Sequence, residues 1–551
     1  MRPSPLLLLA CVGCSFPRPK DLPTDAEPSP DAGAAPGDFV ANLDGARIHL
    51  TEGSTTTVGI KLDRNAFADA ISVTVGGLPD GVTADPLTIA GDSGTLILHG
   101  TIDATQGEAA LTVTAASATR SHDIPLSLLT MGLPGTLDKS FHWVSSSLAP
   151  NAQISAIAVQ PDGKIVIAGP PTLVADERSL IVAARYLADG TRDTTFAAEA
   201  IAFDSAITSI DAITLQPDGK IVVVGTCFSG GVVVRLNTSG APDSTFGKGG
   251  LVTLELSAET PTSTAFRAVA LQPDGGILVA GHTVAVQQNR DAIIVRLTPE
   301  GSIDRSFGAM GHTTAPFGAG QNEFLAMALQ PDGKIVAAGT AIPPGVSSGA
   351  VLARFDRGGQ LDNTFHGNGM YIVGARDTVG GLGSAGWVTI QPTGKIVAGG
   401  SATDGVGLVR LNGSDGSADT SFGAGGFKEI GIALAPLTFG PLIRGIIQQP
   451  DGRIIVGGSA PNGVINLDPD VGGSNYDTFA ARFTSDGLLD FSFAGSGVVS
   501  HDFSADNGLI NGLELLAGIA FDPDGRIVVA SDSLSPGNTT PYYSTIGRFW
   551  P

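Results

Sequence analysis

From Phe39 to about Leu129 the chain alternates apolar and polar residues in short runs separated by glycine and proline. Segments such as "TTTVGIKL", "ISVTVGGL", "GTLILHG" and "AALTVTAAS" have the two-residue period of strands with one buried face, whereas "LPDGV" and "GDSG" are turn sequences. Long segments with the period of an amphipathic helix are hard to find. The pattern predicts an antiparallel β-sandwich of immunoglobulin-like type over residues 39–130.

Beyond residue 132 one hairpin sequence occurs seven times. "LQPDGKIVVVG" at residues 215–225 is nearly matched by segments that begin at Val159, Leu271, Leu329, Ile390, Gln448 and Phe521. Their second residues are Gln160, Gln216, Gln272, Gln330, Gln391, Gln449 and Asp522, with intervals of 56, 56, 58, 61, 58 and 73 residues. Such a period holds four short strands with their turns, which predicts one blade of a β-propeller for each repeat.

Two further elements recur with the hairpin. A turn of the form G-x-x-D-x-[ST]-F occurs seven times, and an arginine stands seven times in the predicted third strand. Each arginine that is followed by such a turn precedes the turn aspartate by eight or nine residues. The arginines are Arg185, Arg235, Arg296, Arg354, Arg410, Arg482 and Arg548, and the aspartates are Asp138, Asp193, Asp243, Asp304, Asp362, Asp419 and Asp490.

At the two ends of the repeat region the arginine and the turn aspartate do not occur as a pair. Asp138 has no arginine before it, and no aspartate follows Arg548, because the chain stops at "GRFWP". Both mismatches disappear if "KSFHWVSSS", which follows Asp138, supplies the fourth strand of the last blade. That closure removes the open edges that a ring of sheets would expose. We therefore predict an all-β, seven-bladed propeller over residues 132–551, closed by an N-terminal strand.

The combination of QPDGK-I-V-x-x-G, the third-strand arginine and G-x-x-D-x-[ST]-F resembles the bacterial delta-60 repeat family. The resemblance covers roughly residues 132–551. It implies β-propeller architecture, and it implies no common activity or catalytic residues. The repeated residues are therefore interpreted as structural: Pro-Asp-Gly forms a turn, the arginine meets a turn aspartate within or between blades, and the phenylalanine packs between blades.

The N-terminal segment is typical of a secretory signal sequence rather than of a membrane-spanning helix. "MRPSPLLLLACVGCS" has one early positive charge, a short apolar run and small residues before a cysteine, which resembles the lipobox of bacterial lipoproteins. Residues 1–14 are predicted to be a signal peptide with lipidation at Cys14; Cys11 is the alternative, and so is ordinary secretion. Residues 15–38 are rich in Pro, Ala and Asp and predict a disordered tether. The expected location is the outer membrane or cell surface.

The composition of the chain limits the kinds of partner molecule that it is expected to bind. The formal net charge of −22 leaves no basic stripe for nucleic acid, so we expect membrane attachment only through the lipid. The eight histidines have no metal-ligand spacing, and no nucleophile elbow or phosphate-binding loop is present, so no catalytic or cofactor site is predicted. One oxygen-rich segment is a candidate cation loop or simply a solvated acidic loop; its residues are Asp468, Asp470, Asn475 and Asp477.

Function is expected on one face of the propeller. In alternating strands the stereotyped turns lie on one face, and the second-to-third and fourth-to-first connections, which vary, lie on the other. Recognition usually resides in loops on a rigid scaffold. We predict a monomer that binds a protein or glycan through the variable face, with Phe439, Tyr542 and Tyr543 as candidate contacts. The alternatives are a propeller hydrolase or lyase acting on an extracellular polymer, and a purely structural envelope module.

Overall fold

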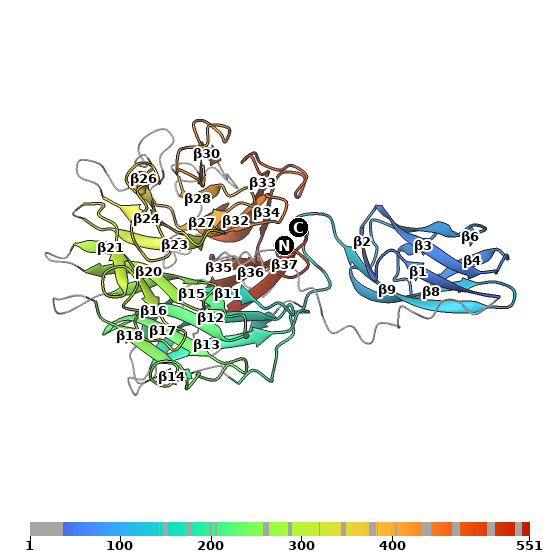
Figure 1. Ribbon diagram of the computed structural model, residues 1–551, viewed down its shortest axis with the longest axis horizontal. Helices are drawn as coiled ribbons and strands as arrows, with labels where there is room; N and C mark the ends of the chain where they lie inside the picture. The colour runs from blue at the N-terminus through green and yellow to red at the C-terminus, as the bar shows by residue number, and fades with distance from the viewer. Residues whose placement is uncertain are drawn as a thin grey trace. The chain divides into compact units, whose positions relative to one another are not determined.

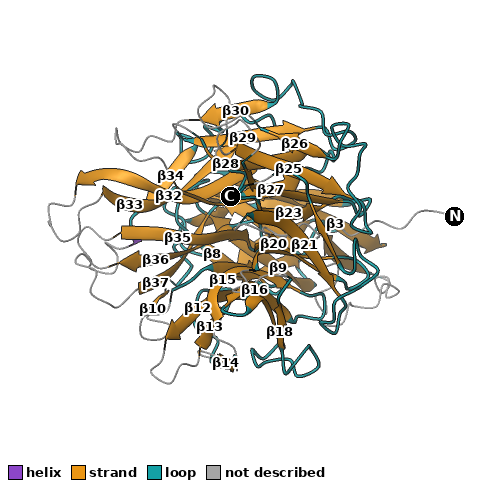
Figure 2. Ribbon diagram, turned by 90° about the vertical axis from the view of Figure 1, so that its left-hand side faces the viewer, coloured by secondary structure: helices purple, strands orange, loops and turns teal. Residues whose placement is uncertain are grey.

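The computed structural model describes residues 37–142, 144–146, 153–173, 179–197, 201–203, 207–256, 264–284, 289–318, 320–342, 349–373, 382, 384–402, 405–430, 442–465, 474–503, 513–534 and 543–551. All of the named elements in these ranges are strands (Figure 2). The chain divides into two compact units. The N-terminal unit ends at His142 and includes Trp550, whereas the repeat unit contains Trp143–Phe549.

The N-terminal unit consists of two sheets that share one core. The first has the order β1 (Asp38–Leu43), β3 (Thr55–Asn65), β7 (Ser93–Gly100), β5 (Val82–Ala84). The second has the order β2 (Arg47–Thr51), β9 (Ser121–Met131), β8 (Gly107–Ala116), β4 (Ile71–Gly76), β6 (Leu87–Ile89), and only the β2–β9 pair among the described strand pairs is parallel. Phe39 and Leu98 of the first sheet are buried in one cluster with Leu111 and Leu128 of the second. These alternating apolar positions are the ones that predicted the strands.

The boundary between the units differs from the expected one. Residues 132–142, which carry the first G-x-x-D-x-[ST]-F turn, group with the N-terminal unit rather than with the repeats. Hydrogen bonds explain the grouping: Gly135 N donates to the carbonyl of Trp550, and Trp550 N donates to that of Thr136. Gln106 of the sandwich accepts from the backbone of Lys139 and from the Trp550 indole.

In the described part of the repeat unit the strands form seven four-stranded antiparallel sheets. Six are made of four consecutive strands each; the first sheet contains β11 (Ala156–Val159), β12 (Ile165–Leu173), β13 (Ser179–Tyr186) and β14 (Ile201–Phe203), and the second contains β15 (Ile207–Leu215), β16 (Ile221–Cys227), β17 (Gly230–Leu236) and β18 (Leu251–Leu254). The third contains β19 (Ala265–Leu271), β20 (Ile277–Val284), β21 (Arg290–Leu297) and β22 (His312–Thr314), and the fourth contains β23 (Glu323–Leu329), β24 (Ile335–Ala341), β25 (Gly349–Phe355) and β26 (Met370–Ile372). The fifth contains β27 (Trp387–Ile390), β28 (Ile396–Ser401), β29 (Val406–Leu411) and β30 (Phe427–Ile430), and the sixth contains β31 (Leu442–Gln448), β32 (Ile454–Ile465), β33 (Ser474–Phe483) and β34 (Val498–His501). In Figure 1 the first strands lie near the centre of this unit and fourth strands such as β18 and β26 lie at its outside.

The seventh sheet joins the two ends of the repeat region. Its order is β10 (Val144–Ser146), β37 (Tyr543–Phe549), β36 (Ile527–Leu534), β35 (Leu513–Phe521). β10 pairs antiparallel with β37, and Ser145 faces Thr545. The sequence predicted this pairing from the unmatched aspartate and arginine at the two ends.

Apolar residues join each sheet to its neighbour in the series. One buried cluster combines Leu278 and Ile294 of the third sheet with Met327 and Val351 of the fourth. Similar clusters join the first sheet to the second, the second to the third, the fourth to the fifth and the fifth to the sixth. β11 of the first sheet also contacts β35 of the last, so the series closes on itself.

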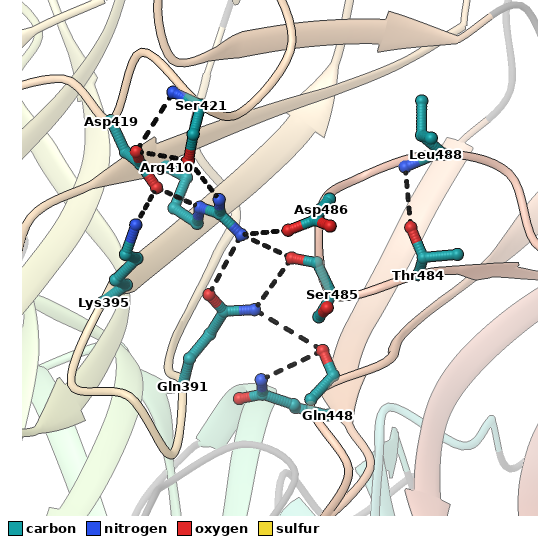
Figure 3. Close-up of polar contacts among 11 residues, drawn as sticks. Gln391, Lys395, Arg410, Asp419, Ser421, Gln448, Thr484, Ser485, Asp486 and Leu488 are labelled. Carbon is teal, nitrogen blue, oxygen red and sulfur yellow. Dashed lines mark hydrogen bonds and ion pairs between the residues drawn. The ribbon is translucent and has the colours of Figure 1, made fainter.

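Among the described residues, five of the repeated arginines add a polar joint to this apolar packing, and Figure 3 shows the one at Arg410. Arg410 Nε donates to Asp419 Oδ2 at 2.6 Å within the same sheet, and its Nη1 donates to the carbonyl of Ser485 in the next sheet. The guanidinium lies 4.6 Å from the ring centre of Phe422. That ring occupies the place where a Cβ at Gly487 of the next turn would lie, so the repeated glycine admits the neighbour's phenylalanine.

The same arrangement recurs around the ring. Arginine–aspartate ion pairs join Arg185 to Asp193, Arg235 to Asp243, Arg296 to Asp304, Arg354 to Asp362, and Arg482 to Asp490. Further contacts to the next turn's carbonyls run from Arg185 to Thr238, Arg235 to Pro299, Arg354 to Gly413, and Arg548 to Ala188. The last of these joins the seventh sheet to the first.

Arg410→Met should destabilise the repeat unit strongly. The substitution keeps an unbranched side chain but removes the guanidinium from Asp419, which is 6% exposed and keeps only Lys395 as an ion-pair partner among the described residues. Breaking a buried ion pair costs about 3–5 kcal/mol. Calorimetry should therefore show a clearly lower Tm, whereas Arg305→Met, at an exposed arginine, should leave the Tm nearly unchanged. Equal Tm values for the two variants would contradict the role assigned to the arginine.

A buried carboxyl also joins the last sheet to the beginning of the first. Asp532 in β36 accepts from the backbone N of Ile154 at 2.7 Å and from Ser544 Oγ at 2.8 Å. Asp532 is 7% exposed. Burial raises the pKa of this carboxyl to about 7, against the opposing effect of the bonds from Ser544 and Ile154.

The raised pKa of Asp532 predicts a stability that falls as pH rises. An ordinary aspartate, with a pKa of about 3.9, represents the unfolded chain. The stabilisation is thus complete below that value and is lost as pH rises through about 7. Asp532→Asn should flatten the pH dependence of unfolding by a few kcal/mol between about pH 4 and pH 7, the range between the unfolded and folded pKa values. Asp218→Asn, at an exposed turn carboxylate, is the control and should retain the wild-type profile.

Candidate functional site: the central cavity

The first strands of the sheets line a cavity of about 350 Å³ in the centre of the repeat unit. Its wall contains one equivalent residue from every repeat, five positions before the repeated glutamine or its replacement Asp522. Unlike the repeated turns, this position differs in chemistry from sheet to sheet: it is Ser155, Asp211, Arg267, Leu325, Gly386, Arg444 or Ala517.

A β-bulge directs this residue into the cavity. In the second sheet the register shifts between Ile210 and Ala212, so Asp211 has no partner on β16. Ile210 and Ala212 are both buried, whereas Asp211 between them is only half-buried. Equivalent shifts occur at Arg267, Leu325, Arg444 and Ala517. A bulge re-aims a side chain away from the ladder, and bulges are frequent next to functional sites.

A charge network of three consecutive sheets lies at this cavity. Arg267 Nη1 donates to Asp211 Oδ1 at 2.6 Å, and its Nε donates to Glu323 Oε1 at 2.7 Å. His282 Nδ1 lies 2.9 Å from the same Glu323 oxygen, and Arg290 Nη1 lies 3.7 Å from Oε2. Arg267 therefore has a carboxylate on either side, and its charge is matched by the protein itself.

The pKa of Glu323 limits the chemistry that this charge network can perform. Burial alone would raise its pKa, but the hydrogen bond and charge of His282, together with those of Arg267, lower the pKa to about 2. The carboxyl is thus ionised throughout the neutral range and does not carry a transferable proton. Glu323 holds Arg267 and His282 in position and is unsuited to act as a general acid.

Arg444 is the second cation of the cavity wall. It lies in β31, is exposed, and makes no hydrogen bond or ion pair with any residue that the structure describes. Trp387 of β27 adds an aromatic side chain to the wall, and Ser155 and Ser384 add hydroxyls. Arg267 and Arg444 against Asp211 give the charged lining residues a formal sum of +1, whereas the whole chain carries −22.

The residues singled out by the sequence fall elsewhere. Phe439, Tyr542, Asp468, Asp470, Cys11 and Cys14 lie outside the described residues, and Asn475 and Tyr543 are described only in their backbone. Asp477 lies half-buried in β33. Over the described ranges there is no group of three or more His, Cys, Asp or Glu side chains that could hold a metal ion. No helix within them is sufficiently long and apolar to cross a membrane.

The wall residues were not identified from the sequence. Their signal is a single position, five before each repeated glutamine, that changes from Asp to Arg to Leu within otherwise apolar strands. Without the bulge, alternation assigns that position to the side of the strand away from its buried neighbours and does not show that all seven converge.

Comparison with known proteins agrees with the repeat architecture. Six segments match a family model described as "Domain of unknown function (DUF5122) beta-propeller", and each runs from a repeated glutamine to the phenylalanine of the turn: residues 160–196, 216–246, 272–307, 330–365, 391–422 and 449–493. These six segments are therefore similar to the repeats of a β-propeller family. A search of curated proteins gave no match.

Solved structures show only distant similarity. A Quinonprotein alcohol dehydrogenase-like protein from Bacteroides thetaiotaomicron is 11% identical with a TM-score of 0.31, over 83% of this chain and 95% of that one. Domains 4 and 5 of the S-layer protein SbsC are 16% identical (TM-score 0.13, 16% and 51% coverage). An endo-fucoidan hydrolase of glycoside hydrolase family 107 is 13% identical (TM-score 0.16, 37% and 28% coverage). These scores carry no argument about function.

Proposed function

We propose that this protein is a non-catalytic binding protein of the bacterial cell envelope, in which a seven-bladed propeller of delta-60 type recognises a glycan or protein partner. Lipidation at Cys14 anchors the chain, residues 15–38 form a tether, and the two-sheet sandwich is an immunoglobulin-like spacer. The seven four-stranded sheets and the β10–β37 pairing support the blade count. The lipobox-like sequence supports the anchor and the outer-membrane or cell-surface location.

The observation that carries the binding role is the central cavity with its irregular wall. Every repeat contributes the same structural turn, yet the bulge position of the first strand differs in charge and size. Asp211 lies at the middle of β15, whereas Arg267 lies in the first half of β19, nearer the end at which that strand begins. The variable connections lie at that end, so cavity and loops would form one recognition surface.

The same cavity favours binding over catalysis. Asp211 and Glu323 are both engaged by Arg267, and the pKa of Glu323 is low, so neither is suited to donate a proton to a leaving group. A hydrolase or lyase in the cavity mouth is the second candidate, and it would need an acid from outside this network. A purely structural module is the third.

Binding by the purified chain without its first 14 residues decides among the three candidates. We expect tight binding to a member of a panel of glycans and envelope proteins, with no change in the partner after prolonged incubation. Chemical turnover would favour the enzyme, and no binding would favour the structural module. Short Gly-Ser turns in place of the variable loops should weaken binding; unchanged binding would contradict the assignment of the face.

The anchor is tested by metabolic labelling with an alkyne fatty acid in a bacterial host. The wild-type chain and Cys11→Ser should incorporate the label and fractionate with membranes, whereas Cys14→Ser should lose both properties. The reverse result for the two variants would move the lipid to Cys11. A wild-type chain that takes up no label and appears in the medium would replace the anchored protein with a secreted one.

A further inference from the structure

An unmatched cation and an open space lie side by side in the cavity wall. Arg444 in β31 has no polar partner among the described residues, unlike Arg267, which two carboxylates hold. β27 and β31 contact each other, and Gly386, the equivalent residue directly before β27, lines the same cavity. A Cβ at Gly386 would meet no atom within 4 Å, which leaves room where other repeats place a side chain such as Leu325.

The groups around this space define the ligand that would fill it. A free guanidinium prefers the two oxygens of a carboxylate, which it can bind with two parallel hydrogen bonds. Trp387, directly after Gly386, lines the cavity and is partly buried against the apolar cluster between the fifth and sixth sheets, so its exposed part is an aromatic surface that a ring can contact. Ser384 and Ser155 offer hydroxyls. A cavity of about 350 Å³ is at the lower end of ligand pockets, which span roughly 300–1,000 Å³.

We propose that the cavity binds a carboxylated sugar residue, with its carboxylate on Arg444, its ring in the space at Gly386 beside Trp387, and its hydroxyls toward the serines. This assignment rests on the proposed binding function and names its ligand class. A single negative charge suits the formal sum of +1 on the lining residues. A strongly acidic protein would repel a highly charged polyanion, whereas one carboxylate at a local positive site is attracted.

Titration calorimetry of the whole mature chain tests the assignment with D-glucuronate and D-galacturonate as probes. D-glucose and D-galactose test the need for the carboxylate, and inorganic sulfate tests whether an anion is sufficient. We expect the uronates to bind, the neutral sugars to bind at least about tenfold more weakly, and sulfate not to compete. Raising the salt concentration should weaken uronate binding. A matching oligogalacturonide distinguishes a chain end from a free monosaccharide as the source of the ligand.

Two variants test the residues. Arg444→Gln removes the charge and should weaken uronate binding at least about tenfold. Gly386→Leu fills the open space with the side chain that the preceding repeat carries as Leu325, and should abolish binding. Arg305→Gln, an exposed arginine outside the cavity wall, is the matched control and should bind as the wild type does. Equal Tm values would show that all three variants are folded.

Several results would overturn the assignment. These are no uronate binding by the wild type at millimolar concentration, equal binding of glucose, displacement of uronate by sulfate, or unchanged binding in Arg444→Gln or Gly386→Leu. Failure of the assignment is distinguishable from failure of the proposed function. If a glycan or protein from the panel binds the wild type and both variants equally, the binding role stands and the cavity is not its site.

Discussion

The fold depends on one interaction, the contact of a third-strand arginine with its own turn and with the turn of the next sheet. Arg354 is completely buried, and Arg235 and Arg410 are nearly so. A buried guanidinium must have its hydrogen bonds satisfied, because an unpaired one is very costly. Apolar layers between sheets are non-directional and tolerate a range of angles. In five of the seven sheets the arginine also donates to a turn carbonyl of the next sheet, so there it favours one angle between successive sheets.

The last repeat differs from the others in the sequence around this arginine. Its fourth strand, β10, comes from the other end of the repeat region, so no turn aspartate follows Arg548 along the chain. In this repeat alone the position of the glutamine holds Asp522, and Asp522 Oδ2 lies 3.4 Å from Arg548 Nη1. Asp522 also accepts from Arg526, which takes the place of the usual lysine. Arg548 thus has a carboxylate of its own sheet within reach, and its Nη1 also donates to the carbonyl of Ala188 in the first sheet.

Much of this architecture follows from sequence because its causes are local and repeated. The eight-residue separation of Arg235 and Asp243 is the length of a hairpin that returns a turn to its own strand. Five further arginine–aspartate pairs with a separation of eight or nine residues support that interpretation. Other features depend on contacts between residues far apart in the chain. Grouping Trp550 with the N-terminal unit depends on its bonds to Gly135, Thr136 and Gln106, and no local pattern encodes these.

The residues of the cavity wall were not predicted from the sequence, for a different reason. A strand pattern assigns alternate residues to opposite faces, and a bulge inserts one residue that belongs to neither. In the sequence alone, Asp211 and Arg267 are therefore indistinguishable from other single polar residues within apolar strands. Because the bulged residue makes no ladder pair, its side chain can change without altering the sheets on either side. Residues as different as Leu325, Arg444 and Ala517 occupy the bulge in different repeats. Each repeat thus combines a third-strand arginine that tolerates almost no substitution with one cavity-wall position of the first strand that can vary. These variable positions surround one cavity, so selection for a ligand could act on them without loss of the fold.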